Sequence, residues 1–252
     1  MTINNETVGI SAELAVADIF DVPVNAAYRQ RGNAEIAAAI GGVAAEAFAK
    51  YGIPRPIKHI AEKDDLVDFL LENGETLSVK SNMKTNDKVA PQKVGQPTAD
   101  SYFFEHFSEF YDIEAIQRKK RGRKNDEEEQ KKALEKVRLF KTTTLARTDE
   151  LMRVYWNNLF DCDYLLYISG VLLPGNRLNP RMKCLVFPNL QTPNWDYKKF
   201  SFTKSAESWN ESCTVKYAGV TIGDFQVHKN RDNLKFRFAL KGVQKLMARG
   251  EI

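Results

Sequence analysis

Two charged side chains stand in segments whose other residues are typical of buried β-strands. Asp68 lies within the apolar run 66–71, and Lys80 lies within the β-prone run 76–81. A protein core accepts such charges only when they are paired or bind an ion. Asp68 and Lys80 are therefore the first candidates for a chemical site in this chain.

A tight turn predicts that the two charges share one β-hairpin. Asn73 and Gly74 separate the two runs, and this dipeptide is typical of hairpin turns. In the second strand, Ser78 and Lys80 are two residues apart, so their side chains point to the same face. Pairing of the strands would allow Ser78 and Lys80 to share a site with Asp68.

A preceding helix offers a carboxylate to the same site. Glu46 follows Gly42 by four residues in the Ala-rich stretch 34–50, and the missing side chain of Gly42 would allow a close approach to the sheet. Two carboxylates and a lysine suit metal-assisted hydrolysis of a phosphodiester. The carboxylates bind Mg²⁺, the ion polarises the phosphate and acidifies a water, and the lysine orients that water. Glu13 and Glu35, on equally Ala-rich helices, are alternatives to Glu46.

The elements that must position these residues belong to a chain of 252 residues, 43% of them hydrophobic, with a net charge of +4. This composition is sufficient for a sizeable core, and the mild basic excess is compatible with a polyanionic partner. The longest apolar runs are too short for a membrane span, and the first residues lack a signal-peptide profile. Cys162, Cys184 and Cys213 form no CxxC pair, which argues against a disulfide framework and a zinc site.

The periodicity and turn residues predict an α/β or α+β fold with a mixed central sheet flanked by helices. Helices are expected at 12–20 after Ser11, at 34–50 after Asn33, and at 98–117, 126–141, 148–159 and 241–249. Further strands are expected at 163–169, 182–187, 214–217, 220–227 and 234–239. We expect one domain over 1–252.

The predicted hairpin resembles the core motif of the PD-(D/E)xK nucleases, and among them the type II restriction endonucleases. The resemblance rests on residues 67–69 and 77–80 on either side of the turn, with Gly42 and Glu46 as the helix feature of many members. It implies a restriction-endonuclease-like catalytic core over about 33–112, a helical insertion over about 113–160, and a C-terminal β region over about 161–252 that recognises DNA.

The same resemblance implies a role for each residue of the motif. Asp68 binds the metal ion, Lys80 serves the attacking water, and Glu46 is an auxiliary ligand. Val79, between the two motif residues of the second strand, is a further candidate ligand. Mg²⁺ is the implied cofactor.

Ser78 departs from the motif, because it stands where the family has Asp or Glu. The substitution removes one carboxylate and leaves the number of metal ions open. Glu75 could replace it only if the strand register slipped, since residues three apart on a strand face opposite sides.

Candidate DNA contacts lie in two later segments. Gln92 and Gln96 follow the lysine strand in a stretch similar to comparable stretches of restriction enzymes. The expected hairpin 226–237 presents four polar residues: Gln226, His228, Lys229 and Arg231. Gln can bind adenine, and Arg or Lys can bind guanine, in the major groove. The basic run 118–124 is a candidate phosphate contact, although such runs are more often solvated helix faces.

These features predict a bacterial, cytoplasmic type II restriction endonuclease that hydrolyses double-stranded DNA at a specific site with Mg²⁺. A homodimer is expected, because each strand needs an active site. A cognate DNA methyltransferase is expected in the same system. The alternatives are a structure-specific DNA repair endonuclease of the same fold and a non-catalytic DNA-binding module, which the Ser78 substitution would suit.

Overall fold

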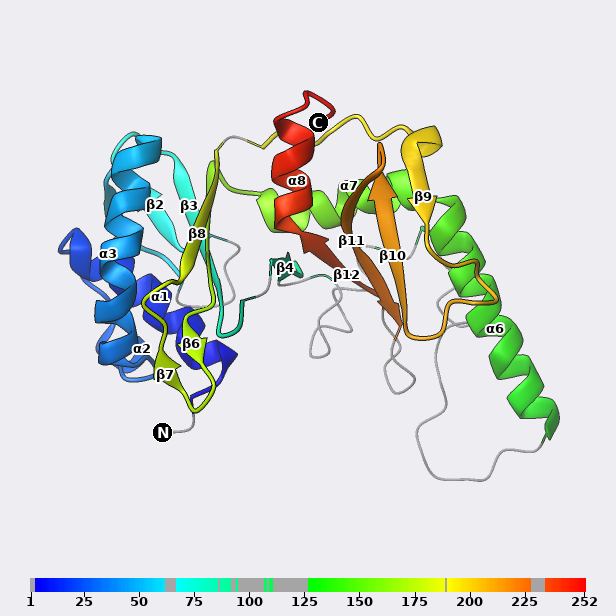
Figure 1. The fold of residues 1–252 in the computed structure, drawn as a ribbon, viewed down its shortest axis with the longest axis horizontal. Coiled ribbons are helices and arrows are strands. Elements are labelled where there is room, and N and C mark those ends of the chain that lie inside the picture. Colours follow the sequence, from blue (N-terminus) through cyan, green and yellow to red (C-terminus); the bar gives the residue numbers. More distant parts are fainter. Residues whose placement is uncertain are drawn as a thin grey trace. The chain divides into compact units, whose positions relative to one another are not determined.

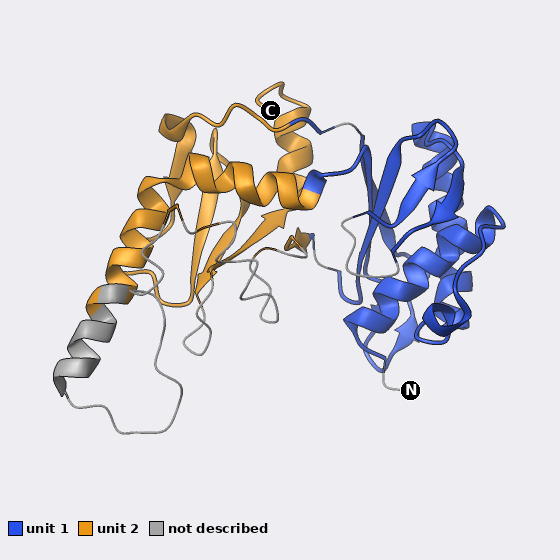
Figure 2. Cartoon of the chain, turned by 180° about the vertical axis from the view of Figure 1, so that it is seen from behind, with its two compact units in different colours: residues 1–87, 160–191 blue, residues 88–159, 192–252 orange. Residues whose placement is uncertain are grey.

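A computed structural model describes residues 3–61, 67–85, 87–91, 94, 107, 109–110, 127–188, 190–227 and 234–252. The chain divides into two compact units, shown in different colours in Figure 2. Unit 1 comprises residues 1–87 and 160–191, and unit 2 comprises residues 88–159 and 192–252. Each unit is built from two stretches that are distant in the chain. The single domain expected from the sequence stays a prediction.

Unit 1 is organised around a five-stranded mixed sheet. Its strands, in spatial order, are β1 (Pro56–His59), β2 (Phe69–Leu71), β3 (Thr76–Asn82), β5 (Tyr164–Ser169) and β8 (Lys183–Pro188). Figure 1 labels β2, β3 and β8 of this sheet. The pair β3 and β5 is parallel, whereas the other neighbouring pairs are antiparallel. The expected mixed sheet is confirmed. The strands β5 and β8, which were expected in a separate C-terminal region, complete the sheet that contains the candidate site.

The predicted hairpin is formed by β2 and β3. Phe69 lies opposite Leu77, and Leu70 lies opposite Thr76. Gly74 has φ +86° in the connecting turn, a conformation that favours glycine. This register places Ser78, the residue after Leu77, beside Asp68, the residue before Phe69.

Helices α1 (Asn5–Ile19) and α3 (Ala34–Tyr51) pack against each other and against the sheet, with the short α2 (Ala26–Arg29) between them in sequence. Asn33 caps α3 as predicted, by accepting a hydrogen bond from the backbone N of Ile36. The prediction for the first helix was wrong at its start. Asn4 provides the cap, and Ser11 lies inside the helix, where its hydroxyl donates to the carbonyl of Thr7 at 2.6 Å.

Unit 2 contains an antiparallel sheet. Its strands, in spatial order, are β4 (Lys88–Val89), β12 (Leu234–Ala239), β11 (Val220–Val227), β10 (Ser212–Tyr217) and β9 (Phe200–Phe202). Its helices are α6 (Glu127–Ala146), α7 (Thr148–Phe160), α8 (Leu240–Met247) and the 3-10 turn η1 (Tyr197–Lys199). The predicted strands β10, β11 and β12 and the predicted helices α7 and α8 are confirmed. The chain also forms the small hairpin β6 (Leu172–Leu173) and β7 (Arg177–Leu178) in unit 1.

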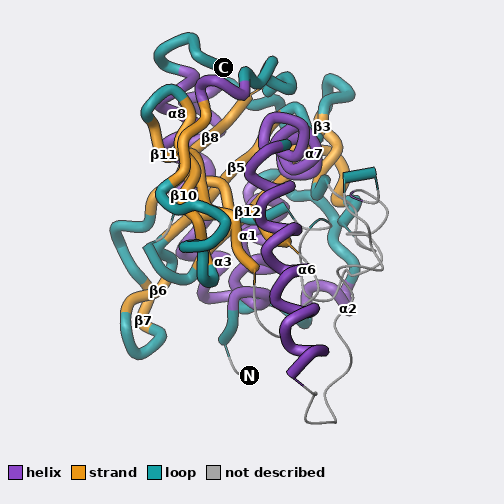
Figure 3. Tube along the Cα trace, turned by 90° about the vertical axis from the view of Figure 1, so that its right-hand side faces the viewer, coloured by secondary structure: helices purple, strands orange, loops and turns teal. Residues whose placement is uncertain are grey.

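Aromatic side chains hold α7 on one face of the unit 2 sheet. The Tyr155 ring lies 5.7 Å from that of Phe236, and the Trp156 ring lies 5.8 Å from that of Phe238. The Tyr155 hydroxyl donates to the carbonyl of Leu234 at 2.9 Å. Arg147 is a turn residue between α6 and α7, and these two helices run in different directions in Figure 3. Among the described helices, none is long and apolar enough to cross a membrane.

Helix α8 packs closely on the sheet at Gly242, and a substitution there tests this contact. A methyl group there would overlap the backbone carbonyl of Thr221 on β11. We expect Gly242→Ala to lower the free energy of unfolding by about 1–3 kcal/mol, because neither backbone can move away without repacking. Urea denaturation followed by circular dichroism measures the change.

Gly42 provides the matched control, and it also corrects an expectation. A methyl group at Gly42 would meet no described atom within 4 Å, so the close approach expected at this residue does not occur. Gly42→Ala is expected to raise helix stability by up to about 1 kcal/mol. Equal stabilities for the two variants would contradict the packing described for α8.

Candidate active site

The Asp68 carboxylate lies at the centre of a cluster in unit 1. Its Oδ2 atom accepts hydrogen bonds from the backbone N of Val79 at 2.5 Å and from the Ser78 hydroxyl at 3.3 Å. The Lys80 ammonium lies 3.4 Å from the same oxygen. Asp68 is only 3% exposed. The structure therefore brings Asp68, Ser78 and Lys80 together, as the hairpin register predicts.

The backbone explains why the Asp68 side chain takes this position. Its N–H donates to the carbonyl of Leu77 at 2.9 Å, and its carbonyl accepts from Ile60 at 3.0 Å. Asp68 lies one residue before the start of β2. Its carboxylate accepts the hydrogen bond from the Val79 N–H that the backbone of a neighbouring strand would otherwise accept. The N–H and C=O of one strand residue point to the same edge, so the Val79 carbonyl is directed to this side of β3. Among the described residues, Asp68 Oδ1 has no hydrogen-bond partner.

Glu13 of α1 supplies a second buried carboxylate near the first. It is 8% exposed, and its Oε2 atom accepts a hydrogen bond from the Tyr28 hydroxyl at 2.6 Å and lies 3.1 Å from His59 Nε2. Burial raises the pKa of Glu13, the hydrogen bond with His59 opposes this change, and the negative charge of Asp68 raises the pKa further. The positive charge of Lys80 also acts on Glu13. Glu13 is therefore within electrostatic range of the Asp68 cluster.

Glu46, the helix carboxylate expected from the sequence to join the site, is placed differently. It is exposed on α3, and among the described residues it makes no contact with Asp68, Ser78 or Lys80. Glu13, one of its two stated alternatives, is the helix glutamate that feels the charge of Asp68. A sequence signal for the burial of Glu13 was available, because this residue interrupts the apolar run 8–17.

His59 and Tyr28 were not identified from the sequence. The His59 ring lies 5.0 Å from the Tyr28 ring and 5.1 Å from the Phe69 ring, so it is enclosed by aromatic groups. Burial and the neighbouring Glu13 raise the pKa of Tyr28, which keeps its hydroxyl protonated as a donor. Both residues bind Oε2 of Glu13, and Oε1 has no hydrogen-bond partner among the residues described.

Glu75 does not replace the missing carboxylate at Ser78. It lies in the turn, where its Oε2 accepts from the Asn73 side chain at 2.6 Å. Cys162 lies close enough to Lys80 and Asp68 for their charges to act on its thiol. Burial raises the pKa of Cys162 to about 12, so this thiol stays protonated and is a poor nucleophile. None of the three cysteines forms a disulfide.

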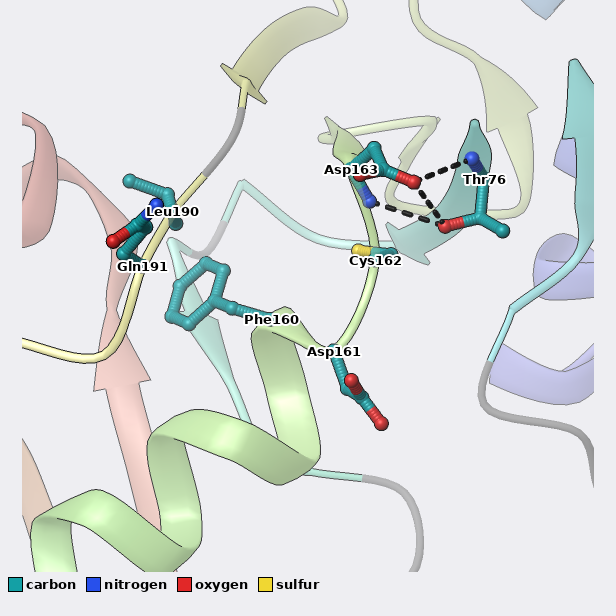
Figure 4. Close-up of a pocket in the computed structure, with 7 residues that line it drawn as sticks. All are labelled: Thr76, Phe160, Asp161, Cys162, Asp163, Leu190 and Gln191. Atoms are coloured by element: carbon teal, nitrogen blue, oxygen red, sulfur yellow. Dashed lines mark hydrogen bonds between the residues drawn. The ribbon is translucent and has the colours of Figure 1, made fainter. Parts of the chain in front are cut away.

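A pocket of about 520 Å³ lies beside the start of β5 (Figure 4). The Asp163 carboxylate accepts hydrogen bonds from the backbone N of Thr76 at 2.8 Å and from its hydroxyl at 2.9 Å. These bonds tie the start of β3 to the start of β5, a structural role. Asp161 points away from this pair in Figure 4.

The predicted DNA contacts are only partly within the described structure. Gln226 lies on β11, half-buried, opposite Lys235 of β12, so the expected antiparallel pair is confirmed. Five predicted contacts lie outside the described residues: Gln92, Gln96, His228, Lys229 and Arg231. The same is true of the basic run 118–124 and of most of the expected helix 98–117.

The donor set around Asp68 suits a hard cation. Oxygen atoms without a hydrogen-bond partner in the described structure are present on Asp68 and Glu13, and the Val79 carbonyl faces the same side of β3 as the Asp68 side chain. No group of three His, Cys, Asp or Glu side chains with metal-binding geometry exists among the described residues. Mg²⁺ fits this set, because it commonly uses one or two carboxylates and retains several waters.

Comparison with known proteins gives one informative match. The chain is 28% identical over 187 residues to the type II restriction enzyme CviAII of Paramecium bursaria Chlorella virus 1. The match covers 74% of this chain and 46% of that enzyme, so the chain spans about half the length of its curated relative. No model of a known protein family matches the chain.

Proposed function

We propose that this chain is a type II restriction endonuclease with a PD-(D/E)xK-like core, which hydrolyses double-stranded DNA in the presence of Mg²⁺. The observation that carries the proposal is the buried cluster in which Asp68, Lys80 and Glu13 act on one another electrostatically. A chain gains no stability from burying two carboxylates near each other, so the arrangement favours a functional role. The similarity to a type II restriction enzyme supports the same class.

Three oxygen donors would hold the cation: the carboxylates of Asp68 and Glu13 and the backbone carbonyl of Val79. When bound, Mg²⁺ would neutralise charge on the scissile phosphate and lower the pKa of a water. Lys80 keeps its ammonium beside Asp68, where it can donate a hydrogen bond to the attacking water or to a phosphate oxygen. Ser78 adds only a hydroxyl, so we propose a single metal ion.

The test is incubation of purified protein with a long DNA of known sequence, with Mg²⁺ or with EDTA, followed by sequencing of the ends. Discrete Mg²⁺-dependent fragments that share one end sequence are expected. Cutting that follows branches or damage would indicate a repair nuclease. Binding without cutting would indicate a non-catalytic module. Homodimerisation, a cytoplasmic location and a partner methyltransferase remain predictions.

Tyr28 is expected to act as a positioning residue for Glu13. The Tyr28→Phe substitution removes the hydroxyl that donates to Oε2 at 2.6 Å and leaves the ring in place. We expect Mg²⁺ affinity, measured from the metal dependence of cleavage, to fall by roughly 10-fold to 100-fold, the usual effect of losing a group that orients a metal ligand.

Tyr51→Phe is the matched control, because Tyr51 is an exposed tyrosine on α3 of the same unit. It should keep the Mg²⁺ affinity of the wild type. An unchanged Mg²⁺ affinity in Tyr28→Phe, with the fold intact by circular dichroism, would show that the hydroxyl does not orient a metal ligand.

A further inference from the structure

Unit 2 contains a third buried carboxylate, Asp224, which the proposed chemistry does not use. The Asp224 side chain on β11 is 3% exposed. Its Oδ1 atom lies 2.7 Å from the Lys88 ammonium, and its Oδ2 atom lies 2.9 Å from Arg237 Nη2. Arg237 Nε also donates to Oδ2 at 3.3 Å. One buried anion therefore fixes two cations from two other strands.

The strand register places further polar residues on the same face of the sheet. Asp224 lies opposite Arg237 and Thr214, and Gln226 lies opposite Lys235. Residues opposite one another on paired strands share a face. We call this set the basic sheet face: Lys88, Thr214, Asp224, Gln226, Lys235 and Arg237. The opposite face carries the aromatic residues that pack against α7, so the basic sheet face is not that core face.

Cations outnumber carboxylates among the residues of the basic sheet face. Lys88, Lys235 and Arg237 share this face with one carboxylate, Asp224. The Lys88 and Arg237 side chains are 33% and 32% exposed, so both reach solvent although Asp224 does not. A structural ion pair needs only one cation for each carboxylate. The additional cations, held in fixed positions, complement a polyanion.

We propose that the basic sheet face binds the phosphate backbone of duplex DNA, and that Asp224 is a positioning residue that holds Lys88 and Arg237 toward it. The inference rests on the proposed function, because it assigns the DNA-contacting surface of that nuclease. Phosphate contacts by Lys and Arg add affinity that depends on salt and not on base sequence. Thr214 and Gln226 add hydrogen-bonding groups between the cations, typical of a surface that follows a DNA backbone.

The test measures DNA binding by Lys235→Ala and Arg237→Gln, each alone, with fluorescent duplexes in Ca²⁺ over a range of salt concentrations. Lys235 makes no ion pair with Asp224, so its variant keeps the test valid if Arg237→Gln unfolds. We expect weaker binding to all sequences and a decrease of about 1 in the slope of log affinity against log salt. Lys198→Ala is the control, because Lys198 is an exposed lysine of η1, outside the strands that form the basic sheet face. It should match the wild type.

Wild-type affinity and salt slope in folded Lys235→Ala and Arg237→Gln would overturn the inference. Weaker binding to one DNA sequence only, with an unchanged salt slope, would also overturn it, because that result indicates base recognition. Cleavage by the wild-type protein with Mg²⁺ is measured in parallel. If the wild type cuts DNA while both variants bind normally, the inference alone fails. If the wild type never cuts, the proposed function fails.

Discussion

Asp68→Asn is expected to lower the rate of DNA cleavage by about 10³-fold, because a metal ion contributes several kcal/mol of transition-state stabilisation and each factor of ten in rate corresponds to roughly 1.4 kcal/mol. Asn retains an oxygen that can accept the hydrogen bond from the Val79 N–H, so the hairpin should keep its structure. Single-turnover cleavage of a substrate that contains the recognition site measures the effect.

A binding measurement and a control variant show whether the loss of cleavage is specific to the metal site. Binding of DNA in Ca²⁺ should stay within about threefold of the wild type, because the substitution removes one charge and leaves the DNA-contacting surfaces intact. Asp161→Asn, which changes an exposed aspartate of the same unit, should cleave at the wild-type rate. Wild-type turnover by Asp68→Asn would rule out Asp68 as the metal ligand.

Glu13→Gln is expected to weaken the binding of Mn²⁺, a substitute for Mg²⁺, by about 10²-fold. The amide keeps the size of the side chain and can still bind Tyr28 and His59, but it lacks the negative charge that attracts the cation. Isothermal titration of the metal into the protein measures the change without any need for activity.

Glu46→Gln provides the contrast on α3. Glu46 is exposed, so its substitution should leave Mn²⁺ affinity unchanged. The pair of variants therefore decides which helix supplies the second carboxylate. A loss of affinity in Glu46→Gln together with normal binding by Glu13→Gln would reverse the assignment.

The part of the site that depends on local structure could be predicted from the sequence. The Asn73-Gly74 turn fixes the hairpin, and the two-residue period of a strand places Ser78 and Lys80 on one face. Both signals come from neighbouring residues. The cluster around Asp68 then follows from the pairing of β2 with β3.

The choice of the helix carboxylate could not be predicted in the same way. Both α1 and α3 are rich in alanine. The position of Glu13 within the apolar run 8–17 indicates burial, but it does not show that this glutamate is turned toward Asp68. That orientation depends on how α1 packs on β3, a contact between distant parts of the chain. The roles of Tyr28 and His59 depend on the same packing, because both residues meet Glu13 only in the folded protein.

The two units and the basic sheet face also depend on distant residues. β3 pairs with β5, which lies more than eighty residues further along the chain. Lys88 and Arg237 meet at Asp224 from segments separated by most of the chain. Sequence periodicity contains information on neighbouring residues, so it predicts strands such as β11 and β12 and does not predict which distant strands they join.

Anomalous diffraction from crystals that contain Mn²⁺ would locate the proposed metal ion. One strong peak is expected, bounded by the carboxylates of Asp68 and Glu13 and the carbonyl of Val79, and it should be lost in Asp68→Asn crystals. A peak at Glu46 or at Asp163, or a peak that persists in Asp68→Asn, would contradict the assignment of this cluster as the active site.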